Sequence, residues 1–105
     1  MKIRDILNKD TATISFEVFP PKKSTDLGNV EAAALGIAAL QPAYMSVTYG
    51  AGGSTKGHTI ALAQAIQEKY NVPTIAHLTC VCANREGIKA ALSELKSAGI
   101  ENILA

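Results

Sequence analysis

Residues 44–55 read YMSVTYGAGGST, and this stretch joins a run of strand-forming residues to a glycine-rich turn and a helix start. Residues 44–49 include the β-branched and aromatic residues that favour strands. The glycines that follow tolerate backbone angles that other residues avoid, which is typical of a tight turn. Ser54 or Thr55 then offers a side-chain oxygen to cap a helix that we expect to run to about Tyr70. The stretch therefore predicts a strand that leads through a turn into a helix.

The same alternation of strand and helix extends in both directions from this stretch. Glu17, Thr48 and His77 occupy comparable positions in successive strand-like runs, and they are separated by 31 and then 29 residues. That spacing is typical of a βαβ unit, and such alternation predicts a parallel sheet in an α/β fold. The other expected elements are strands at 13–19, 74–81 and 102–105, a helix at 25–40, and a helix capped by Asn84 and ended by Gly99.

The composition is that of one globular domain. The chain has 105 residues, of which 48% are hydrophobic and 18% charged, and its net charge is +1. The charges form no basic stripe, so we expect no binding to nucleic acid. No apolar run approaches the roughly 20 residues of a membrane helix, and the N-terminus leads into no signal peptide, so we expect no membrane association.

The two cysteines, Cys80 and Cys82, lie two positions apart, which on a regular strand puts both side chains on the same face. The pair makes a poor disulfide framework, and no second Cys or His pair completes a zinc site. We therefore expect reduced, buried thiols and no metal site.

Alternation along each strand sorts the side chains onto two faces. One face is apolar, and we expect helices to cover it, whereas the other is mixed or polar. In a barrel the mixed face points inward, and active sites form at the carboxyl ends of the strands. Glu17, Thr48 and His77 fall on the mixed face towards those ends, so they could converge at one site. The apolar face carries Ile14, Phe16, Val18, Met45, Val47, Tyr49, Ala76, Leu78 and Cys80.

Glu17 is the least ordinary of the three candidates. Glutamate is depleted in strands, and burial of its charge costs several kcal/mol unless it is paired. It lies between Phe16 and Phe19 and precedes two prolines, which predicts a partly apolar pocket. Such a pocket favours a protonated carboxyl, which suits a general acid, and a structural ion pair is the alternative. For Thr48 and His77, ordinary structural roles are the alternatives.

The glycine loop at residues 50–55 has a second interpretation. Backbone amides and the helix dipole at a helix start can hold an anion. The loop matches neither the dinucleotide fingerprint nor the Walker loop. A plain tight turn and a small α/β anion-binding module therefore stay open as alternatives.

Four ordered motifs resemble those of the methylenetetrahydrofolate reductase family. SFEVFPPK at residues 15–22 is similar to that family's opening motif, SFEFFPPK. SVTYGAGGST at 46–55 and AHLTC at 76–80 are similar to its second and third motifs, and GIENILA at 99–105 resembles the approach to the fourth. The resemblance covers nearly the whole chain.

The resemblance implies a (β/α)8 TIM barrel that binds FAD, takes NADH or NADPH as reductant, and converts 5,10-methylenetetrahydrofolate to 5-methyltetrahydrofolate. It implies that Glu17 donates the proton that opens the five-membered ring of the folate, and that Thr48, Tyr49, Ala51 and His77 contribute to the flavin pocket. It further implies a part in methionine synthesis, a cytoplasmic location and a homo-oligomeric enzyme.

The chain is short for such a barrel, which takes about 250 residues. It provides three βα units and the start of a fourth strand, so we interpret residues 1–105 as the N-terminal part of a single TIM-barrel catalytic domain. In the family, a Leu-Arg-Gly-Asp stretch and further strands follow. Alone, the chain is expected to expose the inner face of its sheet and to bind FAD weakly or not at all. A truncated, inactive product is the alternative.

Overall fold

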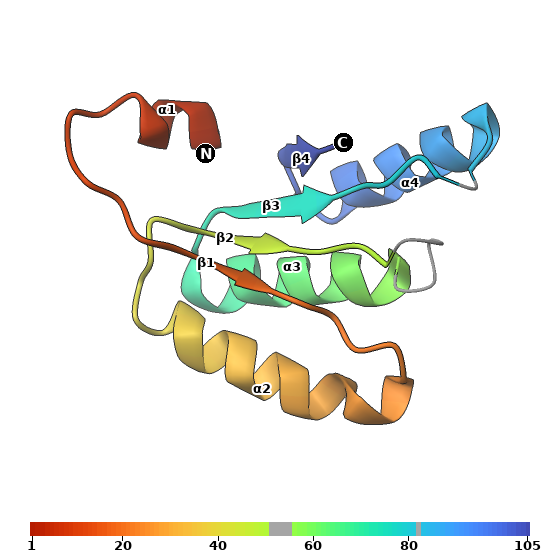
Figure 1. Cartoon of the computed structure of the whole chain (residues 1–105), viewed down its shortest axis with the longest axis horizontal. Coiled ribbons are helices and arrows are strands. Elements are labelled where there is room, and N and C mark those ends of the chain that lie inside the picture. Colours follow the sequence, from red (N-terminus) through yellow and green to blue (C-terminus); the bar gives the residue numbers. More distant parts are fainter. Residues whose placement is uncertain (51–55, 82) are drawn as a thin grey trace.

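The computed structural model describes residues 1–50, 56–81 and 83–105, in which strands alternate with helices (Figure 1). Each strand and helix expected from the sequence is present. β1, β2 and β3 are shorter than expected because all three end before the predicted runs do, and β1 also begins two residues later. The elements are α1 (Ile3–Leu7), β1 (Ser15–Val18), the 3-10 turn η1 (Ser24–Asp26), α2 (Leu27–Ala38), β2 (Tyr44–Val47), α3 (Lys56–Tyr70), β3 (Thr74–His77), α4 (Arg85–Ser97) and β4 (Asn102–Leu104).

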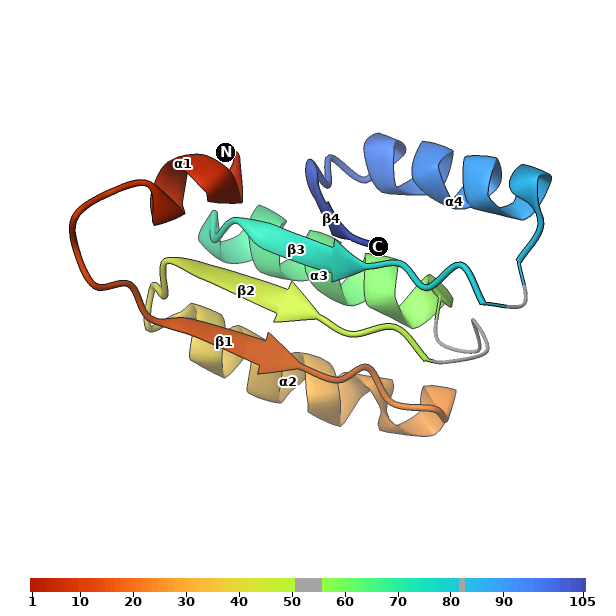
Figure 2. The ribbon, with the colours of Figure 1, turned by 45° about the horizontal axis from the view of Figure 1, so that its top comes forward.

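The four strands form one parallel sheet in the order β1-β2-β3-β4. Each strand therefore lies beside the next in sequence, as short helical crossovers favour. In the register of this sheet Glu17 lies opposite Ser46, and His77 lies opposite Leu104. All four strands run in the same direction, so their carboxyl ends meet at one edge of the sheet (Figure 2).

The hydrophobic core lies between the sheet and the helices. Figures 1 and 2 show α2 and α3 side by side along one face of the sheet. Met45, Leu62 and Ile66 are fully buried there, and burial of a side chain of this size stabilises the fold by about 1.5–3 kcal/mol. The core cluster comprises Val18, Met45, Val47, Ala76 and Leu78 from the sheet side and Ala34, Ala38, Leu62, Ala63, Ile66, Val72, Ala91, Leu95 and Ile100 from the helices and loops.

The predicted boundaries of α4 are confirmed. The side chain of Asn84 accepts a hydrogen bond from the backbone N–H of Gly87 at 2.8 Å, as an N-cap does. Gly99 follows the helix with φ of +72°, the left-handed conformation that glycine adopts without strain. The predicted caps of α3, Ser54 and Thr55, lie outside the described residues.

The apolar face of β1 is less covered than the sequence predicted. Ile14 is 70% exposed and Phe16 is 39% exposed, and only Val18 of this strand belongs to the core. Among the described residues β1 pairs with a strand on one side only, so its other flank has no neighbour to bury these side chains. Ile14 and Phe16 instead border an open hollow of about 520 Å³ together with Leu40.

Cys80 also differs from the prediction, because it is exposed rather than buried. β3 ends at His77, so the alternation of faces that was used to bury Cys80 does not extend to it. Leu78, the residue directly after the strand, is still buried. Cys82 lies outside the described residues.

The short helix α1, which the sequence did not predict, lies at the amino ends of the strands (Figure 1). Its residues Ile3 and Ile6 are buried. The side chain of Asn102 holds this segment, since it accepts a hydrogen bond from the N–H of Ile3 at 3.0 Å and donates to the carbonyl of Met1 at 3.0 Å. It also donates to the carbonyl of Thr74 at 3.2 Å.

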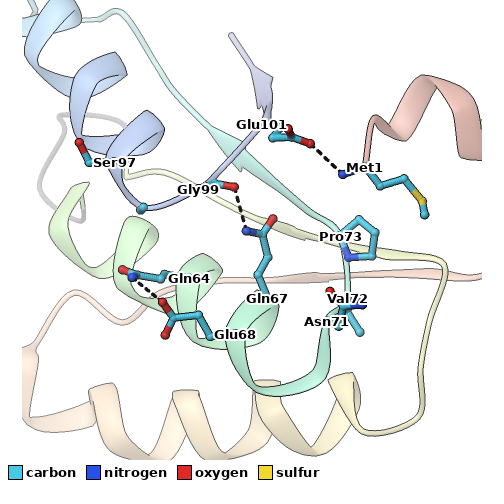
Figure 3. A pocket seen from close by; sticks show the side chains of 11 residues that line it. Met1, Gln64, Gln67, Glu68, Asn71, Val72, Pro73, Ser97, Gly99 and Glu101 are labelled. Atoms are coloured by element: carbon cyan, nitrogen blue, oxygen red, sulfur yellow. Dashed lines mark hydrogen bonds and ion pairs between the residues drawn. The ribbon is translucent and has the colours of Figure 1, made fainter.

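Near α1, a polar cavity of about 620 Å³ opens at the amino edge of the sheet (Figure 3). The N-terminal ammonium donates to Glu101 at 2.7 Å, and this bond lowers the pKa of the Glu101 carboxyl. Gln67 lines the cavity and donates to the carbonyl of Gly99 at 3.1 Å while it accepts from the hydroxyl of Thr74 at 2.8 Å. These contacts join α3, β3 and the turn before β4.

Candidate functional site

Two of the predicted site residues, Glu17 and His77, lie on the sheet face opposite the core. Met45 and Val47 of β2 point into the core, so Ser46 between them points to the other face. Glu17 lies opposite Ser46 on β1, and His77 is the last residue of β3. The side chains of Glu17, Ser46 and His77 therefore meet towards the carboxyl edge of the sheet. The alternation pattern predicted that Glu17 and His77 come together, but the residue that it singled out on the strand between them was Thr48.

The carboxyl group of Glu17 is the centre of this site. The hydroxyl of Ser46 donates a hydrogen bond to Glu17 Oε2 at 2.9 Å. The Nε2 atom of His77 lies 3.5 Å from the same oxygen, which is longer than a usual N–H···O hydrogen bond. The contact with His77 is therefore electrostatic and attractive when the imidazole ring carries a proton.

Glu17 is not enclosed in the partly apolar pocket that the sequence predicted. Its side chain is 47% exposed, and the side chain of His77 is 22% exposed. Phe16 belongs to the opposite face of β1, and Phe19 is 67% exposed. Within the described residues the helices pack on the other face and leave the carboxyl open to solvent, so an apolar pocket around Glu17 stays a prediction for the whole domain.

The backbone of Thr48 is fixed from two directions. Its N–H donates to the carbonyl of Val18 at 3.0 Å, which extends the pairing of β1 and β2 by one residue. Its carbonyl accepts from the hydroxyl of Thr59 on α3 at 2.9 Å, and Thr59 is 1% exposed. Thr48 thus follows β2 directly, and its backbone is held in a fixed position. Its contact with a flavin stays a prediction.

Two other residues predicted for the flavin pocket have different positions. Tyr49 is partly buried and packs against the hydrophobic core, in line with its place on the apolar face of the alternation pattern. Its part in a cofactor pocket stays a prediction. Ala51 lies outside the described residues, and so do the other residues from 52 to 55 of the glycine loop at 50–55, to which the anion-site alternative referred.

The first turn of α3 contributes an anchor that the sequence did not reveal. His58 Nδ1 lies 3.0 Å from the carbonyl oxygen of Pro21, in the loop that follows Glu17. Because a carbonyl oxygen only accepts, Nδ1 carries the hydrogen in this bond. With Thr59 bonded to Thr48, two consecutive residues of α3 hold the segments that follow β1 and β2.

Ser46 is the site residue that sequence reasoning passed over. The alternation pattern put it on the mixed face, but a serine in a strand has no property that marks it as functional. Its contact with Glu17 depends on the register between β1 and β2, which puts the two residues directly opposite each other.

The open face offers one wall for a planar cofactor. Extension of the observed pairing orders Phe19, Thr48, His77 and Leu104 across the four neighbouring strands. Phe19 is 67% exposed and Leu104 is 57% exposed, so apolar surface flanks two hydrogen-bonding residues. That combination fits one side of a flavin ring system. The part of the chain that the structure describes holds no cluster of three His, Cys, Asp or Glu side chains suited to a metal ion.

The chain is similar in sequence to known proteins of one family. A family model described as methylenetetrahydrofolate reductase matches residues 2–105. The chain is 38% identical to methylenetetrahydrofolate reductase 2 of Schizosaccharomyces pombe, over 100% of this chain and 17% of that protein. It is 36% identical to methylenetetrahydrofolate reductase (NADH) 1 of Arabidopsis thaliana, over 99% of this chain and 18% of that protein.

A bacterial relative matches in the same way. The chain is 31% identical to 5,10-methylenetetrahydrofolate reductase of Pectobacterium carotovorum, over 97% of this chain and 36% of that protein. The chain therefore spans between about a sixth and a little over a third of the length of these relatives. None of the helices within the described ranges has the length and apolar character needed to cross a membrane.

Proposed function

The chain belongs to the methylenetetrahydrofolate reductase family, and on this premise we propose that it forms the proton-donating part of an enzyme that reduces 5,10-methylenetetrahydrofolate to 5-methyltetrahydrofolate. Residues 1–105 are the N-terminal part of its single catalytic domain. The activity is a proposal for a whole enzyme, because the chain spans only 17% to 36% of the three relatives described above.

The position of Glu17 is the observation that carries the proposal. Its carboxyl lies on the open face of the sheet near the carboxyl edge, held by Ser46 and 47% exposed. In barrels of parallel strands, this edge is where substrates bind and chemistry occurs. An exposed carboxyl with one fixed oxygen can exchange a proton with a ligand that lies on this face.

Glu17 acts as a general acid in the proposed reaction. The O–H bond of its carboxyl breaks as the proton passes to the ring nitrogen of the folate, and the bond from that nitrogen to the methylene carbon then breaks. The bonding electrons stay on that nitrogen, while the lone pair of the other ring nitrogen forms a C=N bond to the methylene carbon. This iminium carbon then accepts a hydride. FAD, reduced by NADH or NADPH, supplies this hydride when it is bound.

The flavin is proposed to lie against the row formed by Thr48 and His77, with Tyr49 and Ala51 beside it. Support comes from the mixed character of the open face, where Phe19 and Leu104 leave apolar surface exposed next to these polar residues. The name of the Arabidopsis relative specifies NADH as its reductant. For this chain the choice between NADH and NADPH is left to experiment.

The proposed architecture is a (β/α)8 barrel of which this chain forms the first part. The parallel sheet has its strands in sequential order, with the core helices on one face only. Further strands added beyond β4 and beside β1 would continue this sheet and enclose the open face. The exposed side chains Phe16, Ile103 and Leu104 on the outer strands support this arrangement.

The first test reads the coding DNA beyond codon 105. A reading frame that continues with a Leu-Arg-Gly-Asp stretch supports the enzyme. A stop codon at that point contradicts the proposal and favours the inactive product. The variants described below are made in the product of the complete reading frame, which this result defines.

The second test separates the two half-reactions in that protein. Glu17→Gln keeps the shape of the side chain and removes its acidic proton. It should slow reduction of methylenetetrahydrofolate by at least about 10²-fold, because general acids contribute about 10²–10⁴-fold, and leave oxidation of the nicotinamide nearly unchanged. If the rates of both half-reactions fall equally, Glu17 is not the general acid.

A further inference from the structure

We infer that Ser46 is a positioning residue that holds Glu17 through Oε2 and leaves Oε1 as the oxygen that delivers the proton. The inference rests on the proposed function, since it assigns a part in the same proton transfer. The hydrogen bond of 2.9 Å between the Ser46 hydroxyl and Glu17 Oε2 is its starting observation.

Ser46 has the rigidity that a positioning residue needs. It is 9% exposed in the middle of β2, between Met45 and Val47, which are fully buried. Its backbone is paired on both sides, with Glu17 on β1 and Ile75 on β3. The hydroxyl is therefore fixed by the sheet, whereas the Glu17 side chain is 47% exposed and is restrained little by packing.

The hydrogen bond also distinguishes the two oxygens of the carboxyl group. In a protonated carboxyl, one oxygen carries the hydrogen and the other is the better acceptor. The Ser46 hydroxyl donates to Oε2, and His77 Nε2 lies 3.5 Å from that same oxygen. The Ser46 hydrogen bond favours Oε2 as the acceptor, as does His77 when its ring carries a proton, so the transferable hydrogen belongs on Oε1.

The same bond stabilises the product of the transfer. When the proton leaves Oε1 for the folate nitrogen, its bonding electrons stay on Glu17 and the group becomes a carboxylate. The Ser46 hydroxyl then donates to a charged oxygen, and such hydrogen bonds are stronger than neutral ones. Ser46 thus favours both the starting geometry and the charge that develops during proton transfer.

A merely structural role for Ser46 predicts a different result. The Glu17 carboxyl is exposed enough for water to replace the lost hydrogen bond, so removal of the hydroxyl should have a small effect on folding. The main effect is expected on the step that uses the proton. Rates of the two half-reactions therefore distinguish positioning from structural support.

The experiment compares Ser46→Ala, Ser46→Thr and Glu17→Gln in the product of the complete reading frame. Ser46→Ala should slow reduction of methylenetetrahydrofolate about three- to tenfold, as loss of one hydrogen bond predicts, and leave nicotinamide oxidation unchanged. Ser46→Thr keeps a hydroxyl and should stay within about twofold of the unmodified protein. Ser93→Ala, an exposed serine on α4, is the matched control and should have no effect.

The outcomes separate failure of this inference from failure of the proposed function. If Glu17→Gln loses folate reduction while Ser46→Ala keeps the full rate, or while Ser46→Thr is as slow as Ser46→Ala, the inference is wrong and the proposed function stands. If Glu17→Gln keeps folate reduction, the proposed function is wrong. Should Ser46→Ala not fold, Ser46→Cys repeats the test with a side chain of similar shape and a weak donor.

Discussion

The two edges of the sheet use polar side chains in different ways. At the amino edge, Asn102 bonds to backbone atoms of Met1, Ile3 and Thr74, and Gln67 bonds to the carbonyl of Gly99. At the carboxyl edge, the contacts of Glu17 are with side chains, those of Ser46 and His77. The carboxyl of Glu17 nevertheless stays 47% exposed.

This difference separates polar groups that hold the fold from polar groups that are available to a ligand. A side chain that bonds to backbone atoms of several elements fixes those elements, and its loss leaves polar groups without partners. An exposed carboxyl with one fixed oxygen contributes little to stability and has an oxygen left for chemistry. In parallel α/β proteins, active sites and ligand-binding sites lie at the carboxyl ends of the strands.

The largest expected effect concerns the reach of Glu17. Glu17→Asp keeps an acid but shortens the side chain by one methylene, which withdraws the carboxyl from Ser46. Because a misplacement of about 1 Å can reduce a rate about 10²-fold, we expect a loss of that order in folate reduction by stopped-flow. Glu101→Asp, at the amino edge, is the matched control, and a similar loss there would contradict the difference between the edges.

The next effect concerns stability at the amino edge. Gln67→Ala removes the acceptor of the buried Thr74 hydroxyl and the donor to Gly99, so the free energy of unfolding should fall by about 1–3 kcal/mol. Urea denaturation measures this change. Gln64→Ala, one turn earlier, removes only an exposed contact with Glu68 and should change stability by a few tenths of a kcal/mol, about the value of such pairs. Equal losses in the two variants would argue against the stabilising role of Gln67.

A third prediction uses a residue that lies near the carboxyl edge but bonds to backbone. Asn84 caps α4 by accepting from the N–H of Gly87 at 2.8 Å. Asn84→Ala should lower the free energy of unfolding by about 1 kcal/mol, and Asn84→Asp should retain most of it, since Asp is an equally good cap. Thermal unfolding of the three proteins gives the comparison. A loss of folate reduction without a loss of stability would run against our account.

The smallest expected effect concerns His58, which holds the loop after Glu17 through the carbonyl of Pro21 at 3.0 Å. His58→Ala should slow folate reduction about threefold, because loss of this partly buried hydrogen bond lets the loop shift. In His58→Asn, the side-chain amide offers a donor close to the position of Nδ1, and the rate should recover. If the Asn and Ala variants have the same rate, the bond to Pro21 has no part in placing Glu17.

The order of strands and helices could be predicted because local signals agree with the fold. Asn84 and Gly99 mark the ends of α4 by side-chain and backbone preferences that need no tertiary contact. The two faces of β2 and β3 follow from alternation, and Met45, Val47 and Ala76 are buried as expected. These features depend on neighbours along the chain.

Features that depend on neighbours in space could not be predicted in the same way. The bond between Ser46 and Glu17 requires the register of two strands, and the bond between His58 and Pro21 requires the packing of α3 against a distant loop. The burial expected for Cys80 was wrong because β3 ends before it. Glu17 was correctly expected near His77, but its exposure depends on what covers the sheet, which alternation does not specify.

The most direct test of the difference between the edges is one crossed measurement on Glu17→Gln and Gln67→Ala. For each protein, the rate of methylenetetrahydrofolate reduction per folded molecule and the free energy of unfolding are measured together. We predict that Glu17→Gln loses the rate by at least about 10²-fold with little change in stability, and that Gln67→Ala loses about 1–3 kcal/mol of stability with its rate retained. If Glu17→Gln is destabilised as much as Gln67→Ala, or keeps its rate, Glu17 is a structural residue and the account is wrong.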